Sequence, residues 1–205
     1  MPYYLLQIEC REGNYRYVVD RGDELMRRAV PERRAELARV VAESWFHLGD
    51  YNRTLDYLDL FEQSGGESGR DENYLRGFSL YRTARYAEAE EPLRKACGAD
   101  DALTQNASYH LADCCLRNGD KQAAMEAFAM AANEQFDATI AEDALFNYGT
   151  LQYELGGGAF NRAIHVPRRH RARSPPSPPP AAARPPPLPA SPHSPAPPPA
   201  TRAHP

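Results

Sequence analysis

A short turn recurs at a nearly constant spacing along most of this chain, and this spacing limits the possible folds more than any other feature. The turns lie at Gly13-Asn14-Tyr15, Gly49-Asp50-Tyr51, Ala84-Arg85-Tyr86, Gly119-Asp120-Lys121 and from Gly156 onward, and successive turns are 36, 35, 35 and 37 residues apart. A period of roughly 20 to 50 residues is typical of solenoids, in which each unit buries its apolar face against the next unit. The chain is therefore expected to form an array of stacked units.

Each turn lies between two segments with a helical pattern. In the segment 107–131, Leu111 and Cys115 share one face before the turn, and Ala124 and Phe128 share one face after it. Residues three or four positions apart lie on the same side of an α-helix. Helices joined by a short loop must approach closely, and a small residue stands seven positions before the turn in four units: Ala42, Gly77, Ala112 and Gly149. These patterns predict an all-α body of antiparallel helix pairs that turn at Gly49, Ala84 and Gly119.

Three places are expected to depart from regular pairing. Asp20-Arg21-Gly22-Asp23 is expected to interrupt the second helix of a truncated first pair. Pro92 lacks a backbone donor, so its helix is expected to bend or to begin late. A turn is expected at Gly156, and Pro167 would cut short the helix that follows it. The last pair would then leave apolar residues of the segment 141–155 uncovered, which predicts fraying and self-association through this incomplete repeat.

The composition changes sharply near residue 165. Residues 165–205 contain 16 of the 19 prolines and six arginines, with no acidic or aromatic residue. Such a segment cannot bury enough apolar surface to fold, so we expect a disordered, basic, proline-rich tail. Residues 1–164 carry the other 18 basic and all 28 acidic side chains, a formal charge of −10. The expected organisation is a helical body over residues 1–164 and a tail over residues 165–205.

The part of the chain from Tyr3 to about Ile164 resembles the tetratricopeptide repeat (TPR) family. The matching positions are the aromatic residues after the turns at Tyr15, Tyr51 and Tyr86, the small residues of the first helices listed above, and Ala89, Ala124 and Ala163 in the second helices. Lys121 and Thr54 depart from the family pattern, and the proline that usually separates repeats is missing at most boundaries. The tyrosine-rich units look most like exported or outer-membrane-associated TPR proteins of Gram-negative bacteria. The resemblance implies a right-handed solenoid of about four usable helical hairpins, the first and last incomplete.

A TPR solenoid binds partners on its concave side, which the first helix of each pair lines. Counting outward-facing positions on these helices gives a candidate groove rich in aromatic rings, and rigid rings suit the binding of an extended peptide or a partner helix. An alternative is that several of these rings pack between repeats. The candidate partner-binding residues are Arg39, Glu43, Phe46, Tyr74, Phe78, Tyr81, Tyr109, Asp113, Phe146 and Tyr153.

The sequence offers no basis for catalysis. His47 and His110 are 63 residues apart, no nucleophile or metalloprotease motif occurs, and the four cysteines show no metal-ligand spacing. We therefore expect no enzyme, no cofactor and no metal, and cysteines that are reduced or buried rather than redox-active. The acidic body would repel phosphate groups, so no nucleic acid is expected to bind it. The expected function is a non-catalytic protein-interaction scaffold.

The tail allows two interpretations. As a genuine segment, its arginines and prolines predict an adaptor that contacts nucleic acid, an acidic membrane surface or a proline-reading domain. In the second interpretation, the tail is not a natural protein segment but the product of a GC-rich gene read out of frame. Its residues are mostly those with C- and G-rich codons, which supports this interpretation. The chain has neither a run of roughly 20 apolar residues nor a signal peptide. A cytoplasmic location is expected if the chain is whole, and a periplasmic or outer-membrane-associated one if it is a fragment.

Overall fold

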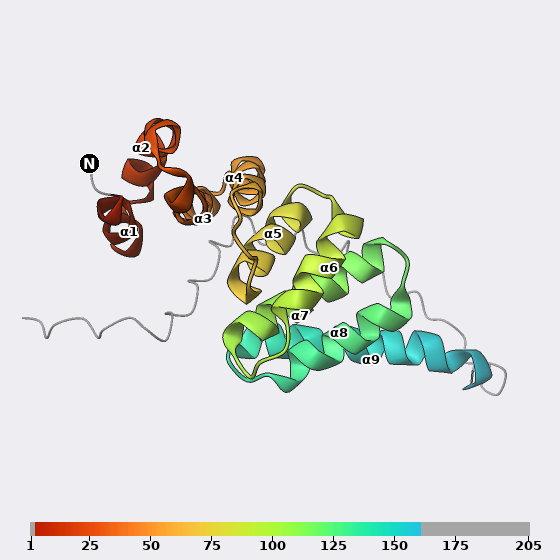
Figure 1. Cartoon of the computed structure of the whole chain (residues 1–205). Coiled ribbons are helices and arrows are strands. Elements are labelled where there is room, and N and C mark those ends of the chain that lie inside the picture. The colour runs from red at the N-terminus through yellow and green to blue at the C-terminus, as the bar shows by residue number, and fades with distance from the viewer. Residues whose placement is uncertain (1–2, 161–205) are drawn as a thin grey trace, which may run out of the picture.

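The computed structural model describes the backbone of residues 3–160 and the side chains of residues 3–156. Every regular element in this part of the chain is an α-helix (Figure 1), as the sequence predicts. The helices are α1 Tyr4–Arg11, α2 Tyr15–Arg28, α3 Pro31–Leu48, α4 Tyr51–Gln63, α5 Arg70–Arg82, α6 Tyr86–Ala96, α7 Ala102–Arg117, α8 Lys121–Asn133 and α9 Ala138–Phe160. The predicted tail and the predicted effect of Pro167 lie outside the described residues.

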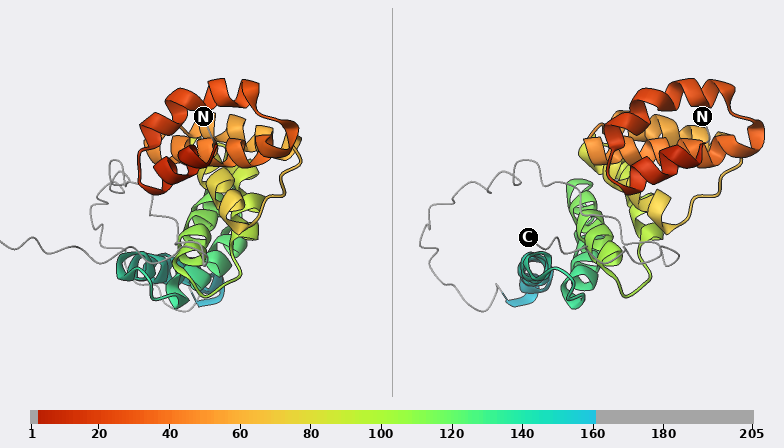
Figure 2. Two further views of the ribbon diagram at one scale, coloured as in Figure 1. Left: turned by 60° about the vertical axis from the view of Figure 1, so that its left-hand side comes forward. Right: turned by 90° about the vertical axis from the view of Figure 1, so that its left-hand side faces the viewer.

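The helices pack in chain order, each against the one before it and the one after it. The helices α1–α3 lie at one end of the array and α8–α9 at the other, as the views of Figures 1 and 2 agree. In addition, each odd-numbered helix from α1 to α7 contacts the next odd-numbered helix. Within residues 3–160, no two of α2, α4, α6 and α8 bring their Cα atoms within 8 Å of each other, although the hydroxyl of Tyr57 in α4 bonds to the carboxylate of Asp23 in α2. The array therefore curves so that the odd-numbered helices lie on the inside.

The predicted turns at Gly49, Ala84 and Gly119 are confirmed, and they share one backbone geometry. Each of these residues has a left-handed φ, 82° at Gly49, 61° at Ala84 and 87° at Gly119. At the first of these turns, the N–H of Gly49 donates to the carbonyl of Phe46, and the next N–H, of Asp50, donates to the carbonyl of Trp45. The same two bonds recur at the other turns. This is the Schellman C-cap, which glycine favours because it has no Cβ.

Ala84 is the one described residue other than glycine with a positive φ. A left-handed conformation costs an L-residue about 1 kcal/mol. We therefore expect Ala84→Gly to raise the free energy of unfolding by about 0.5–1 kcal/mol, measured by urea unfolding. The control is Ala87→Gly, at an exposed position inside α6, which should lower it by a similar amount. Equal destabilisation by both changes would contradict this account of the turn.

Three local predictions need correction. The helix α2 is continuous through Asp20–Asp23, because Gly22 packs against α3, where a Cβ would lie 2.8 Å from Cγ2 of Val41. The helix α6 begins at Tyr86 with Pro92 inside it, so the expected late start is wrong, whereas a bend at Pro92 stays a prediction. The turn expected at Gly156 is absent, and α9 continues to Phe160.

The missing turn at Gly156 has a reason in the sequence. After the turns at Gly49 and Gly119, an aspartate caps the next helix: Asp50 accepts from the N–H of Arg53 and Asp120 from that of Ala123, at 3.0 and 2.9 Å. Such a cap contributes about 1 kcal/mol to the new helix. Gly156 is followed by two more glycines, which have no side chain to cap a helix. Without a cap to start a new helix, α9 continues to Phe160, although each glycine inside it costs about 1 kcal/mol relative to alanine.

The predicted close approach of paired helices is present in the complete pairs. Ala42 and Ala112 are fully buried, and a Cβ at Gly77 would lie 2.6 Å from Cγ of Leu93 in α6. Successive pairs are joined by short loops, of which residues 64–69 form the longest in the described part of the chain. The small residues therefore set the distance between the helices of each pair.

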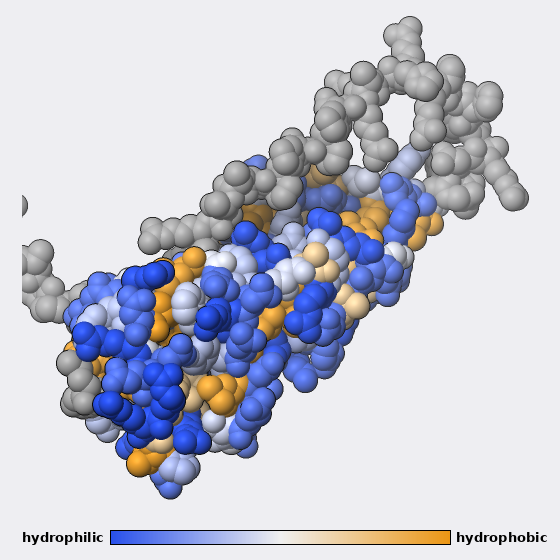
Figure 3. Space-filling model, turned by 90° about the horizontal axis from the view of Figure 1, so that it is seen from above, coloured by the Kyte–Doolittle hydropathy of each residue, from blue (hydrophilic) through white to orange (hydrophobic). Residues whose placement is uncertain are grey.

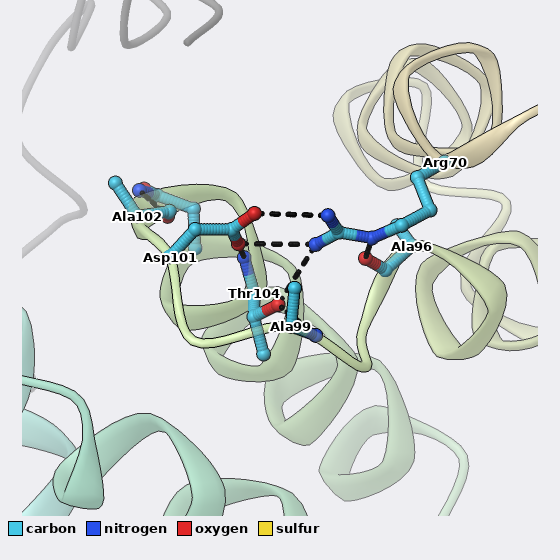
Figure 4. A network of polar contacts seen from close by, with 7 residues as sticks. Arg70, Ala96, Ala99, Asp101, Ala102 and Thr104 are labelled. Atoms are coloured by element: carbon cyan, nitrogen blue, oxygen red, sulfur yellow. Dashed lines mark hydrogen bonds and ion pairs between the residues drawn. The ribbon is translucent and has the colours of Figure 1, made fainter. Parts of the chain in front are cut away.

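A polar network fastens α5 to the start of α7 (Figure 4). The guanidinium of Arg70 forms two parallel bonds to the carboxylate of Asp101, at 2.9 and 3.0 Å. Arg70 also donates to the carbonyl of Ala96 and to the hydroxyl of Thr104. These bonds hold the pKa of Asp101 well below its usual value, at about 2. Because Asp101 also caps α7 by accepting from the N–H of Thr104, one carboxylate fixes both the ion pair and the helix start.

Candidate protein-binding face

The surface formed by the odd-numbered helices on the inside of the curve is called the inner face below. At its α3–α5 end, Arg39 forms ion pairs with Glu43 at 3.6 Å and with Glu72 of α5 at 4.0 Å. Burial raises the pKa of Glu43, and the nearby carboxylates of Asp71 and Glu72 raise it further, whereas Arg39 lowers it. The predicted residues Arg39 and Glu43 thus form one polar patch, with acidic groups in excess of basic ones.

The expectation that Phe46, Tyr74 and Phe78 line an open groove is wrong. Their exposed fractions are 0%, 2% and 4%, and their rings contact one another at centroid distances of 5.4–6.2 Å. Adjacent first helices lie close enough for these rings to fill the space between them, which is the packing role considered as the alternative. Truncating them would remove core contacts, so their substitution cannot report on binding alone. Whether the inner face binds a partner stays a prediction.

A second polar patch lies along α7, which packs against α5 on one side and α9 on the other. The predicted residue Tyr81 of α5 bonds to the carboxylate of Asp113 of α7, which also accepts from Arg117 at 2.9 Å. One repeat further on, the hydroxyl of Tyr109 donates to the carboxylate of Asp143 of α9. Burial and the adjacent carboxylate raise the pKa of both phenols, so both stay protonated donors at neutral pH. The structure therefore brings Tyr81, Tyr109 and Asp113 together as a tyrosine–aspartate ladder.

The two remaining predicted residues lie apart from these patches. Phe146 and Tyr153 of α9 are 73% and 67% exposed, and they lie at the end of the array opposite to Arg39 and Glu43. Other exposed apolar side chains form separate patches on a mainly hydrophilic surface, as one face shows in Figure 3. The ten predicted residues are thus divided among a buried ring cluster, two polar patches and an exposed part of α9.

Sequence reasoning assigned no structural role to His110. The imidazole lies between the rings of Phe78 and Tyr81, at centroid distances of 4.8 and 4.9 Å. Its Nδ1 is buried and has no hydrogen-bond partner within the described residues. Burial lowers the pKa of His110 from 6.5 to about 4, with Asp113 raising it and Arg82 lowering it to smaller extents.

This buried histidine predicts a specific pH dependence of stability. As pH falls from about 7 to about 4, the unfolded chain binds a proton at His110 that the folded protein does not bind, so stability is lost over this window. A shift of this size corresponds to about 3 kcal/mol. We expect His110→Phe to lose less stability than the parent chain between pH 7 and pH 4.5 in urea unfolding. An identical pH dependence in the two proteins would contradict the burial of a neutral imidazole.

Other polar groups offer little for chemistry. Cys10, Cys114 and Cys115 are buried and free, and burial raises the pKa of each thiol above its usual value. Residues 3–156 contain no group of three or more side chains that could hold a metal ion. No helix in the described part of the chain is long and apolar enough to span a membrane.

Comparisons with models of protein families, with curated proteins and with solved structures give no match for this chain.

Proposed function

We propose that this chain is a TPR-type right-handed solenoid that acts as a non-catalytic scaffold and binds a protein or peptide segment on its inner face. One observation carries the proposal: along the array the backbones of successive odd-numbered helices approach one another, whereas within residues 3–160 no two even-numbered helices bring their Cα atoms within 8 Å. The odd-numbered helices therefore form a continuous curved surface, the kind that helical-repeat proteins use for binding. The 35-residue spacing of the turns and the small residues at the helix crossings support the family assignment.

The charges of the inner face favour a basic partner. Glu43 and Glu72 lie at its α3–α5 end, and Asp113 and Asp143 lie on the neighbouring helices α7 and α9. Arg39 and Arg117 balance these carboxylates only in part, and the body carries a net charge of −10. An extended segment with lysine or arginine side chains would complement this surface and would be attracted to it over a distance. The partner we propose is therefore a basic segment of another protein.

The test uses substitutions that remove charge but keep shape. Partners would be captured with the full chain and identified by mass spectrometry, and their Kd would be measured with purified protein. Asp113→Asn together with Asp143→Asn should weaken binding by about tenfold or more. The control is Asp56→Asn with Glu126→Gln, on the exposed surfaces of α4 and α8, which should change Kd by less than about twofold. Equal binding by both double variants would overturn the inner-face proposal.

A second function is proposed for the tail on a different observation. Residues 165–205 carry six arginines and no acidic residue, which suits an adaptor for nucleic acid or an acidic membrane surface. Binding to either should weaken steeply with added salt and should disappear on deletion of residues 165–205. Binding that survives this deletion would exclude the tail as its cause.

A further inference from the structure

The last described helix, α9, has an uncovered face that is called the end face below. It consists of Leu145, Phe146, Gly149, Gln152 and Tyr153, all of which are exposed. Leu145 is 61% exposed and Phe146 is 73% exposed. The opposite side of the same helix carries Ala144 and Leu151, which are 0% and 5% exposed because α8 covers them. The helix is therefore covered on one side only.

The end face corresponds to the surface that the complete pairs bury. Gly149 occupies the position of Ala42, Gly77 and Ala112, where the second helix of a pair crosses the first. At Gly77 a Cβ would collide with Leu93 of that second helix. At Gly149, no described atom lies within 4 Å of the corresponding Cβ position. The end face therefore has the shape of a helix-crossing site in which no described helix is present.

We propose that the end face pairs with the end face of a second copy of this chain, α9 against α9, antiparallel and centred on Gly149. A symmetric dimer needs a surface that is complementary to itself, and a small residue flanked by bulky ones on both sides meets this condition. Leu145 of one copy then faces Tyr153 of the other, and Phe146 faces Gln152. The two glycines let the helix backbones approach closely, as Gly77 does within its own pair.

The charges on α9 agree with this arrangement. In the antiparallel register, Glu142 of one copy lies opposite Gly156 of the other, and Glu154 lies opposite Ala144, so no carboxylate faces another carboxylate. Asp143 is bonded to Tyr109, and Glu154 forms an ion pair with Lys121 at 2.9 Å, both within one copy. Pairing through the end face therefore brings apolar surface together without juxtaposing like charges.

Sedimentation of the full chain over a wide range of concentration tests for the dimer. We expect a reversible monomer–dimer equilibrium, and Leu145→Glu should raise the dimer Kd by at least about tenfold. Ile8→Glu is the matched control, because Ile8 is an exposed aliphatic residue, 51% exposed, on α1 at the other end of the array. It should leave the Kd unchanged. A chain that stays monomeric, or a dimer that responds equally to both variants, would overturn the proposal.

Engineered cysteines test the register. Gly149→Cys places two thiols on the symmetry axis, where mild oxidation should give a disulfide-linked dimer. Gly156→Cys is the control: it is equally open, but in this register it faces Glu142 rather than its own copy, and it should not cross-link. The combination of Glu142→Cys with Gly156→Cys should cross-link again. Cross-linking through Gly156→Cys alone, or its absence with Gly149→Cys, would contradict the proposed pairing.

Discussion

Gln105→Leu should lower the free energy of unfolding by about 3 kcal/mol or more, although leucine is close to glutamine in size. Gln105 is fully buried, and its Nε2 donates to the backbone carbonyls of Ala131, Glu134 and Asp137 at 3.3, 2.8 and 3.0 Å. Its Oε1 accepts from the N–H of Asp137 at 2.7 Å. Leucine would leave these loop groups unsatisfied, and each buried orphan costs about 1–3 kcal/mol.

Urea unfolding measures this loss, and hydrogen exchange locates it. The amides between α8 and α9 should exchange faster in the variant, because Gln105 is the side chain that fastens this loop to α7. Asn106→Leu is the control: among the described residues, the side-chain amide of Asn106 bonds to the carbonyl of Ala102 in its own helix alone, at 2.8 Å, so its loss should cost less than about 1 kcal/mol. Similar losses in the two variants would show that Gln105 is not a structural anchor.

The second large effect is expected at Gly77. Gly77→Ala places a Cβ 2.6 Å from Cγ of Leu93 and 2.9 Å from its backbone nitrogen, so α5 and α6 must move apart. Overpacking of this kind costs about 1–3 kcal/mol, more than the gain of up to about 1 kcal/mol from the helix propensity of alanine.

The sign should reverse at an open glycine of the same chain. Gly156→Ala, where no described atom lies within 4 Å of the new Cβ, should stabilise the protein by up to about 1 kcal/mol. Both changes are the same substitution inside a helix, so their difference isolates the helix crossing. Thermal unfolding of the two variants beside the parent chain gives the comparison. Stabilisation by Gly77→Ala would contradict the close approach of α5 and α6.

The features that repeat in the sequence were predictable, and those that depend on distant partners were not. The turns at Gly49, Ala84 and Gly119 follow from local backbone geometry that glycine or a short loop specifies, so their spacing was sufficient. The burial of Phe46 and Phe78 depends on how closely neighbouring repeats stack, and helical periodicity does not give this distance. Gln105 bonds to backbone groups 26–32 residues away, and nothing in its own segment indicates this.

The residue that follows a turn glycine is a second local signal, and it is missing at Gly156. Glycine spacing alone predicted the turn, but the two confirmed turns at Gly49 and Gly119 are each followed by an aspartate that caps the next helix. Gly156 has no such residue after it. The missing cap therefore disfavours a new helix after Gly156 but does not decide the turn alone, because the confirmed turn at Ala84 is followed by α6 without a side-chain cap.

We propose that the inner face holds a protein partner, and site-specific photo-cross-linking can locate that contact. A photoreactive phenylalanine analogue in place of Tyr109 would stand in the tyrosine–aspartate ladder on the inner face. The same analogue in place of Tyr17, a partly buried tyrosine on the even-numbered helix α2, would be the matched control. We expect a partner to be cross-linked from Tyr109 and not from Tyr17. Cross-linking from Tyr17 alone, or equally from both positions, would contradict it.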